Sequence, residues 1–304
     1  MTKAIKFFLG GLFLGISFAL SFNLLEEKLE NFFYAQIGKP FEEISLVKFS
    51  FPKKPPLEIE AESAFSLKIY PSGKEKILFK KNPEEILPIA SLTKLMTAII
   101  SLENYDLYQE IEVSQRAQNQ VDVLNYGNLK KGEVFSQITL LRLMLVYSSN
   151  DAAFALAEKM GIEKFVKKMN KKAKELGMEN TIFFNPTGLK DGGINLSSIE
   201  DLLKLIKYIL REKPIILEIS RRKLKFEPYH SIFDISLPEG KELLGGKTGF
   251  LPASEIGKNR DWGCMVFVFK DEKRFTYINI ILGAKGAKER VVQMQKLVDW
   301  IFLQ

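Results

Sequence analysis

A serine and a lysine three residues apart are the first candidates for chemistry in this sequence. Ser91 and Lys94 form the pattern Ser-x-x-Lys at the start of an apolar stretch that predicts a helix to about Leu102. Residues three apart share one face of a helix, so the hydroxyl and the amine are expected within hydrogen-bond reach. A serine needs a neighbouring base to become a good nucleophile, and burial favours the neutral amine that would be this base. By itself, the pattern also fits a serine cap followed by a solvated lysine.

A second polar cluster, Ser148-Ser149-Asn150, separates two stretches that predict helices, 139–147 and 151–160. The hydroxyl of Ser148 would pass a proton between the lysine and a leaving group. The amide of Asn150 both donates and accepts hydrogen bonds, which suits a substrate amide. Ordinary helix capping explains this cluster equally well, because serine and asparagine are favoured at helix N-termini.

A third cluster, Lys247-Thr248-Gly249, follows a glycine-rich run, 243–246, that predicts an edge strand with close backbone approach. An ammonium and a hydroxyl on one strand suit a substrate carboxylate. Gly249 leaves room for a substrate backbone, and the N–H of Phe250 would serve an oxyanion. The alternative is a β-turn with a solvated lysine.

Strands predicted at both ends of the chain enclose a run of predicted helices. This order predicts an α/β sandwich with a mainly antiparallel sheet built from both chain ends, flanked by helices and carrying a helical subdomain. The predicted strands are 65–70, 76–80, 263–270 and 275–282, and the further predicted helices are 162–176, 197–210 and 288–302.

Composition excludes several classes of protein. With one cysteine, Cys264, the chain has no intrachain disulfide and no thiolate metal cluster. The one histidine, His230, stands in a predicted loop without a supporting motif, so we expect neither a Ser-His-Asp triad nor a zinc site. The formal charge of +7 comes from scattered lysines without an aromatic stripe, which argues against nucleic-acid binding. We expect no metal and no cofactor.

The N-terminus predicts membrane targeting. Lys3 and Lys6 precede an uncharged apolar run of 19 residues, Phe7–Leu25, close to the length that crosses a bilayer. We interpret residues 1–25 as a single-pass anchor, with a cleaved signal peptide and secretion as the alternative. The lysines place the N-terminus in the cytoplasm and the remainder outside. Residues 26–63 are proline-rich and predict a spacer, and residues 64–304 predict the catalytic domain.

The three clusters occur together in an order known from penicillin-binding proteins and class A β-lactamases. The chain resembles the low-molecular-weight D-alanyl-D-alanine carboxypeptidases from about Pro56 to its end. The likeness covers the nucleophile segment Pro88–Ala98, the segment Ser148–Ala153, the run Asn185-Pro186-Thr187-Gly188-Leu189 and the third motif through Phe250. It implies the DD-peptidase/β-lactamase-like fold.

The resemblance also implies a role for each site residue. Ser91 attacks the carbonyl between the two D-alanines of a peptidoglycan stem peptide, and Lys94 takes its proton. The remaining residues pass protons, hold the substrate or bind its terminal carboxylate: Ser148, Asn150, Lys247, Thr248, Gly249 and Phe250. The oxyanion hole uses the N–H groups of Ser91 and Phe250. β-Lactams are expected to acylate Ser91.

Two departures from the family pattern lie at or beside the motifs, and three alternative functions stay open. Ser149 replaces the usual glycine of the second motif, and the stretch Leu251–Trp262 is longer and more polar than the resemblance implies. An endopeptidase that cleaves cross-links shares the same motifs. A class A β-lactamase needs a glutamate for deacylation, and residues 180–195 contain none. A catalytically silent peptidoglycan-binding scaffold is the third alternative, although all three motifs are intact.

Overall fold

The computed structural model describes residues 21–22, 24–31, 55–120, 128–222 and 231–303. The chain divides into two compact units, 1–53 and 54–304. Residues 24–31 of the first unit are helical and exposed. Most of the predicted membrane segment, and His230, lie outside the described residues. Within the described ranges, no helix combines the length and the apolar character needed to cross a bilayer.

The second unit begins before the boundary expected at residue 64. Trp300 donates its indole N–H to the carbonyl of Pro55 at 2.8 Å, and Glu60 donates its backbone N–H to Gln293 at 2.9 Å. Ile59 and Ala61 are buried. The last part of the predicted spacer is therefore packed onto the catalytic unit.

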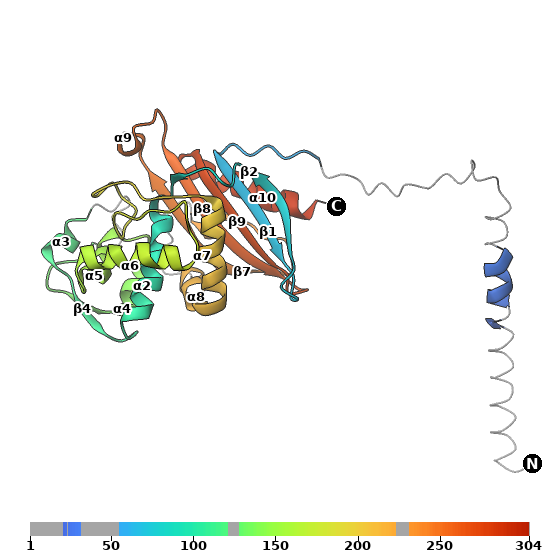
Figure 1. Ribbon diagram of the computed structural model, residues 1–304, viewed down its shortest axis with the longest axis horizontal. Helices are drawn as coiled ribbons and strands as arrows, with labels where there is room; N and C mark the ends of the chain where they lie inside the picture. Colours follow the sequence, from blue (N-terminus) through green and yellow to red (C-terminus); the bar gives the residue numbers. More distant parts are fainter. Residues whose placement is uncertain (1–20, 23, 32–54, 121–127, 223–230, 304) are drawn as a thin grey trace, which may run out of the picture. The chain divides into compact units, whose positions relative to one another are not determined.

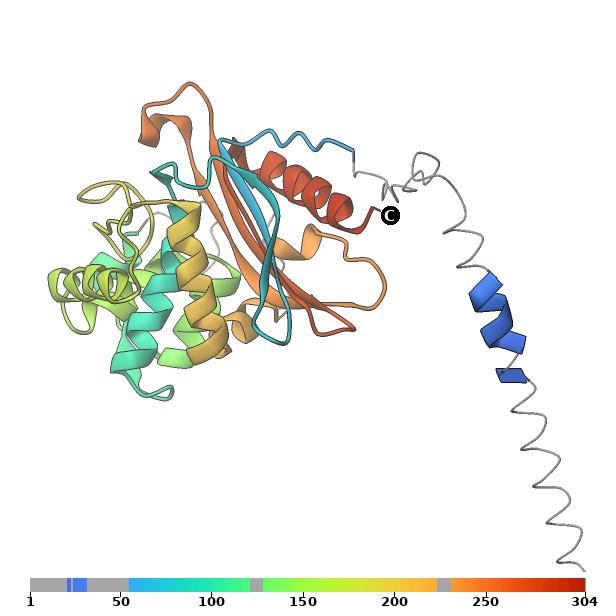
Figure 2. The same cartoon turned by 45° about the vertical axis from the view of Figure 1, so that its right-hand side comes forward.

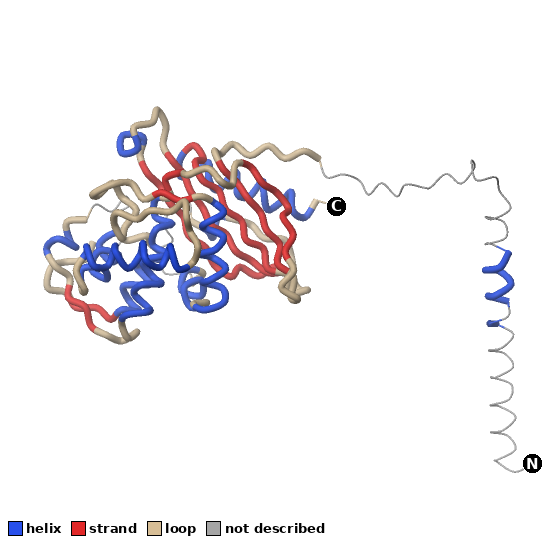
Figure 3. Tube along the Cα trace, in the orientation of Figure 1, coloured by secondary structure: helices blue, strands red, loops and turns tan. Residues whose placement is uncertain are grey.

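A five-stranded sheet in the order β2-β1-β9-β8-β7 is the frame of this unit (Figures 1 and 3). Every neighbouring pair is antiparallel. Because β1 lies beside β9, both ends of the domain meet in one sheet, which confirms the predicted architecture. The strands are β1 (Ser63–Ile69), β2 (Glu75–Lys81), β7 (Lys241–Leu251), β8 (Trp262–Asp271) and β9 (Thr276–Lys285).

Both faces of the sheet are covered, and successive residues of β8 supply the two cores alternately. Val266 and Val268 join the core toward the helical subdomain, whereas Met265 and Phe267 join the core beneath α10 (Gly286–Phe302). Figure 2 shows α10 on one face of the sheet and the helices of the helical subdomain on the opposite face. Central strands buried on both sides explain the unbroken apolar runs in the sequence.

The helical subdomain is built around α2 (Thr93–Asn104), in which every residue from Thr93 to Ser101 is buried. The remaining helices and short strands of the second unit are β3 (Leu87–Pro88), η2 (Ala90–Leu92), β4 (Glu110–Glu112), α3 (Gln115–Gln118), β5 (Val134–Ser136), α4 (Gln137–Val146), α5 (Asn150–Glu158), α6 (Ile162–Glu175), β6 (Leu196–Ser197), α7 (Ile199–Glu212), α8 (Ile215–Ser220), η3 (Ile232–Asp234) and α9 (Ala253–Ile256). The predicted long helices are present with small shifts at their ends.

Candidate active site

Ser91 lies in the single turn of η2, directly before α2. The amine Nζ of Lys94 donates to Ser91 Oγ at 2.9 Å, and the lysine side chain is completely buried. Ala90, immediately before the serine, has a φ of +48°, in the left-handed region that side-chain-bearing residues avoid. Strained backbone of this kind tends to occur at functional sites. The first motif therefore forms the expected pair and not a cap with a solvated lysine.

Acceptors from separate segments of the chain surround the amine of Lys94. Besides Ser91, it donates to Asn150 Oδ1 at 2.7 Å and to the carbonyl of Thr187 at 2.6 Å. An ammonium has three N–H donors, so this arrangement can hold a buried charge. In the neutral amine, the free lone pair can accept the hydroxyl proton of Ser91 instead.

The second motif places Asn150 and Ser148 on either side of a helix cap. Ser149 Oγ accepts the backbone N–H of Ala152 at 3.1 Å, so the residue that replaces glycine caps α5. Ser148 adopts a φ of +63°, a second left-handed residue at the site. Capping thus accounts for the middle serine, and the flanking residues are left to contact the two lysines.

Lys247 belongs to the same site through Ser148. Its Nζ donates to Ser148 Oγ at 2.8 Å and to the carbonyl of Thr248 at 2.7 Å, and only 2% of the residue is exposed. Burial lowers the pKa of Lys247 well below its usual value, and the nearby amine of Lys94 and guanidinium of Arg290 lower it further. The two lysines are therefore close enough to disfavour charge on each other.

The strand that carries the third motif lies directly against the nucleophile turn. A Cβ added to Gly249 would lie 3.0 Å from the Cβ of Ala90 and 3.2 Å from the backbone nitrogen of Ser91. Among the described residues, β7 is the last strand of the sheet and pairs with β8 alone, so it is an edge strand. Thr248 and Phe250 are partly buried beside this glycine. An edge strand has unpaired backbone groups, which suit an extended substrate.

The loop that holds Thr187 in place is also part of the site, although none of the three motifs includes it. Asn185 donates through Nδ2 to the carbonyl of Leu189 at 2.7 Å, and its Oδ1 accepts the N–H of Gly188 at 2.8 Å. Asn195 ties the loop to α2 by donating to Thr93 Oγ1 at 2.9 Å. The family resemblance at residues 185–189 pointed to this segment. The side chains there do not reveal that a backbone carbonyl of the segment accepts a hydrogen bond from Lys94.

Arg290 of α10 is a second contributor that the sequence did not indicate. Its Nη1 donates to the carbonyl of Gly249 at 2.6 Å, and 4% of the residue is exposed. Burial lowers the pKa of this guanidinium to about 10. On the far side of the nucleophile turn, Trp262 donates its indole N–H to the carbonyl of Pro88 at 2.8 Å. These contacts fix the backbone of the third motif and of the segment before Ser91.

Cys264 is buried, and burial raises its pKa to about 12. The long polar stretch after the third motif is ordered by its own contacts. Asp261 accepts the N–H of Ala253 at 3.0 Å, Arg260 pairs with Glu62, and Lys258 Nζ lies 4.4 Å from the ring centroid of Trp262. Within the described part of the chain, no three His, Cys, Asp or Glu side chains group as they would around a metal ion.

Comparison with known proteins places the chain in a family. The family model Peptidase_S11, described as D-alanyl-D-alanine carboxypeptidase, matches residues 50–252. The chain is 31% identical to D-alanyl-D-alanine carboxypeptidase DacF of Bacillus subtilis over 75% of its own length and 59% of the relative's, so it spans less than two thirds of that protein. It is 29% identical to a D-alanyl-D-alanine endopeptidase of Pseudomonas aeruginosa over 81% of this chain and 79% of that one.

Solved structures give the same result. Penicillin-binding protein D2 of Listeria monocytogenes, in its ampicillin-bound form, matches with a TM-score of 0.67 at 28% identity. The match covers 82% of this chain and all of that one. Penicillin-binding protein 6B of Escherichia coli matches with a TM-score of 0.66 at 26% identity, over 82% of this chain and 80% of that one. The chain therefore shares the fold of these penicillin-binding proteins.

Proposed function

The chain belongs to the Peptidase_S11 family of D-alanyl-D-alanine carboxypeptidases, and we propose that it removes the terminal D-alanine from peptidoglycan stem peptides through an acyl-enzyme on Ser91. One observation carries the proposal. A fully buried Lys94 contacts Ser91 Oγ at 2.9 Å, beside a second buried lysine on an open strand edge. A nucleophile, a base and a carboxylate-binding group thereby meet in one place.

Acylation follows from this arrangement. The neutral amine of Lys94 takes the hydroxyl proton while Ser91 Oγ bonds to the carbonyl carbon between the two D-alanines. The carbonyl oxygen becomes an oxyanion on the N–H groups of Ser91 and Phe250. When this intermediate collapses, the peptide C–N bond breaks, and D-alanine leaves after its nitrogen receives the proton from Lys94 by way of Ser148.

Deacylation repeats the steps with water. Lys94 takes a proton from a water molecule, and the resulting hydroxide attacks the ester carbonyl of the acyl-enzyme. The bond to Ser91 Oγ breaks, and the serine regains its proton from the lysine. The shortened stem peptide leaves with a new carboxylate.

The charge on Lys247 influences the protonation of Lys94. Burial lowers the pKa of Lys247, and the nearby Lys94 amine lowers it further. When the substrate's terminal carboxylate arrives, it stabilises the ammonium form of Lys247. A charged Lys247 then disfavours a second charge close by, which keeps Lys94 in the neutral form that a base requires.

An endopeptidase activity on cross-links is the second candidate. It is favoured by the relative from Pseudomonas aeruginosa, which bears that name and of which this chain covers 79%. A β-lactamase activity has less support, because the loop beside Lys94 presents the carbonyl of Thr187 at 2.6 Å and residues 180–195 contain no glutamate.

Covalent labelling tests the proposal. The full-length chain in detergent is incubated with a fluorescent penicillin, and its intact mass is followed beside Ser91→Ala and Lys94→Ala. We expect a persistent adduct that is lost in the serine variant and forms orders of magnitude more slowly in the lysine variant. Rapid turnover of the drug would indicate a β-lactamase, and the absence of any adduct would indicate a silent scaffold.

Product analysis then separates the two peptidase activities. Free D-alanine released from a stem pentapeptide identifies the carboxypeptidase, whereas conversion of a cross-linked dimer to monomers identifies the endopeptidase. If neither substrate is cleaved by a chain that forms the penicillin adduct, the proposed reaction is wrong although the nucleophile is right.

We also propose that residues 1–25 anchor the chain in the cell membrane, with the catalytic unit on the extracytoplasmic side. The apolar run Phe7–Leu25 and the preceding lysines support this proposal. Extraction of membranes with alkaline carbonate should leave the full-length chain in the pellet. A soluble product whose N-terminus begins after residue 19 would show instead that the segment is cleaved.

A further inference from the structure

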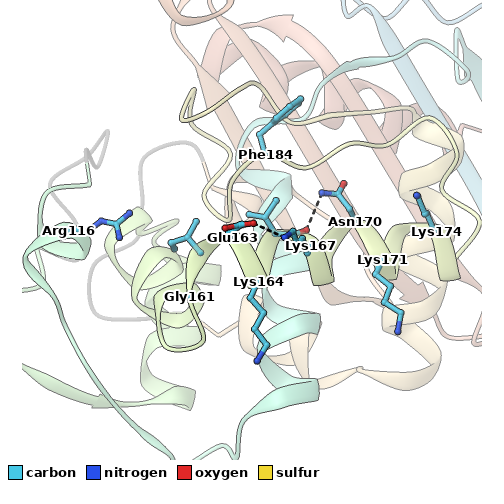
Figure 4. A pocket seen from close by; sticks show the side chains of 11 residues that line it. Arg116, Gly161, Glu163, Lys164, Lys167, Asn170, Lys171, Lys174 and Phe184 are labelled. Atoms are coloured by element: carbon cyan, nitrogen blue, oxygen red, sulfur yellow. Dashed lines mark hydrogen bonds and ion pairs between the residues drawn. The ribbon is translucent and has the colours of Figure 1, made fainter.

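A cationic groove lies along α6, outside the residues assigned to catalysis (Figure 4). Its volume is about 1100 Å³. Glu163 is the one acidic residue of its lining, whereas five lining residues are basic and one is an exposed aromatic residue: Arg116, Lys164, Lys167, Lys171, Lys174 and Phe184. The four lysines recur at intervals of three and four residues, so they follow one side of the helix for about 15 Å.

The charge of this groove is only partly neutralised by the protein itself. Glu163 pairs with Lys167 at 2.6 Å, and Glu175 pairs with Lys171 at 3.6 Å. Among the described residues, no carboxylate lies within 4.0 Å of the amines of Lys164 or Lys174, near the two ends of the row. The groove therefore presents two separated cations to an acidic ligand.

The groove is linked to the active site by a short stretch of chain. Asn170 of α6 donates to the carbonyl of Phe183 at 2.7 Å and accepts its N–H at 2.9 Å, which fixes the segment that carries Phe184. Phe184 is 41% exposed and stands three residues before Thr187, whose carbonyl contacts Lys94. Three peptide units span at most about 11 Å. A polymer in the active site thus lies within reach of the groove.

We propose that this groove binds the acidic peptidoglycan strand outside the active site, through carboxylates of stem peptides next to the one being cleaved. The inference rests on the proposed function. Lys164 and Lys174 supply the charges, and Phe184, which directly precedes the 185–195 loop, supplies an exposed apolar surface. A concave groove suits a polymer chain better than it suits a flat membrane surface. A second contact raises the effective concentration of further stem peptides at Ser91.

Matched lysine variants test the groove. The double variant Lys164→Gln/Lys174→Gln removes the two cations that have no carboxylate partner. Lys288→Gln/Lys296→Gln makes the same change in charge at two exposed positions of α10. We measure kcat/KM for D-alanine release from a soluble stem pentapeptide and from uncross-linked polymeric peptidoglycan.

The groove variant should lose about 3- to 10-fold on the polymer at low salt and nothing on the pentapeptide, because two exposed ion pairs are modest contributions. The loss should shrink at 1 M salt, where charges are screened within about 3 Å. An equal loss on both substrates, or the same loss in the α10 variant, overturns the proposal. Loss of binding to phosphatidylglycerol vesicles with unchanged use of the polymer assigns the groove to the membrane and also overturns it.

Failure of the proposed function is distinguishable. If the parent chain releases no D-alanine from either substrate, sedimentation of the Ser91→Ala chain with insoluble peptidoglycan still reports on the groove. Binding that the lysine changes weaken at low salt supports the second site without catalysis. Binding that they leave unchanged contradicts it.

Discussion

Replacing Gly188 by alanine probes how rigidly the site loop holds the nucleophile. Gly188 has a φ of +91°, and a Cβ there would lie 2.1 Å from the carbonyl oxygen of Ala90 and 2.9 Å from the backbone nitrogen of Ser91. Both atoms belong to main chain, so no rotation of a side chain can relieve the contact. Either the loop or the turn that carries Ser91 must move.

Two contributions determine the loss of unfolding free energy expected for Gly188→Ala. A side-chain-bearing residue in the left-handed region costs about 1–2 kcal/mol. Overpacking that forces a backbone shift adds about 1–3 kcal/mol, so Gly188→Ala should lose about 2–5 kcal/mol of unfolding free energy. Relief of a 2.1 Å contact needs a displacement of roughly 1 Å, which can slow a reaction about 10²-fold when it misplaces the reacting groups.

Gly161→Ala is a closely matched control. Its φ is +92°, yet nothing lies within 4 Å of the position that its Cβ would occupy. Urea unfolding and the rate of acylation by a fluorescent penicillin are measured for both variants. The control should lose about 1–2 kcal/mol and acylate normally. If Gly188→Ala acylates within threefold of the parent chain, the loop does not fix the nucleophile and the reasoning fails.

Three further predictions concern buried groups. The Ser91→Ala chain should take up protons when it binds a peptide ending in D-Ala-D-Ala, at pH values between the lowered pKa of Lys247 and about 10.5, because the bound carboxylate raises that pKa again. Calorimetry in buffers of different ionisation heat measures the proton uptake, and Lys247→Met should abolish it. Arg290→Met leaves the carbonyl of Gly249 without this donor, so urea unfolding should show a loss of about 1–3 kcal/mol and acylation should slow. Cys264, whose pKa is raised to about 12, should resist iodoacetamide at pH 8 until urea unfolds the chain; equal rates with and without urea would contradict its burial.

Much of the fold was predictable because its elements have clear periodicity. The helix that carries Lys94 and the central strands 263–270 and 275–282 are rich in apolar residues, as expected of elements that are largely buried. The meeting of β1 and β9 followed from the order of strands and helices. The strand carrying the third motif was underestimated, because its glycines break the apolar pattern although it runs from 241 to 251.

The parts of the site that could not be predicted act through main-chain atoms. Thr187 reaches Lys94 with its carbonyl, so the identity of its side chain does not reveal the contact. Arg290 donates to the carbonyl of Gly249 from the last helix, a pairing of positions 41 residues apart that only the folded chain brings together. Motif reasoning finds reactive side chains and overlooks the backbone groups that orient them.

Buried lysines and strained backbone at the site lower the stability of the fold, so many surrounding contacts are needed to hold them. Two lysines are essentially buried, and Ala90 and Ser148 each adopt a left-handed backbone next to a functional residue. Buried charge and strained backbone both oppose folding, so they persist only where surrounding contacts compensate. Here the compensation comes from Ser148 and Asn150, the 185–195 loop and the edge strand, which supply hydrogen-bond acceptors for the two amines. The site is therefore held by segments from across the domain, and loosening any one of them should affect reactivity before it affects the fold.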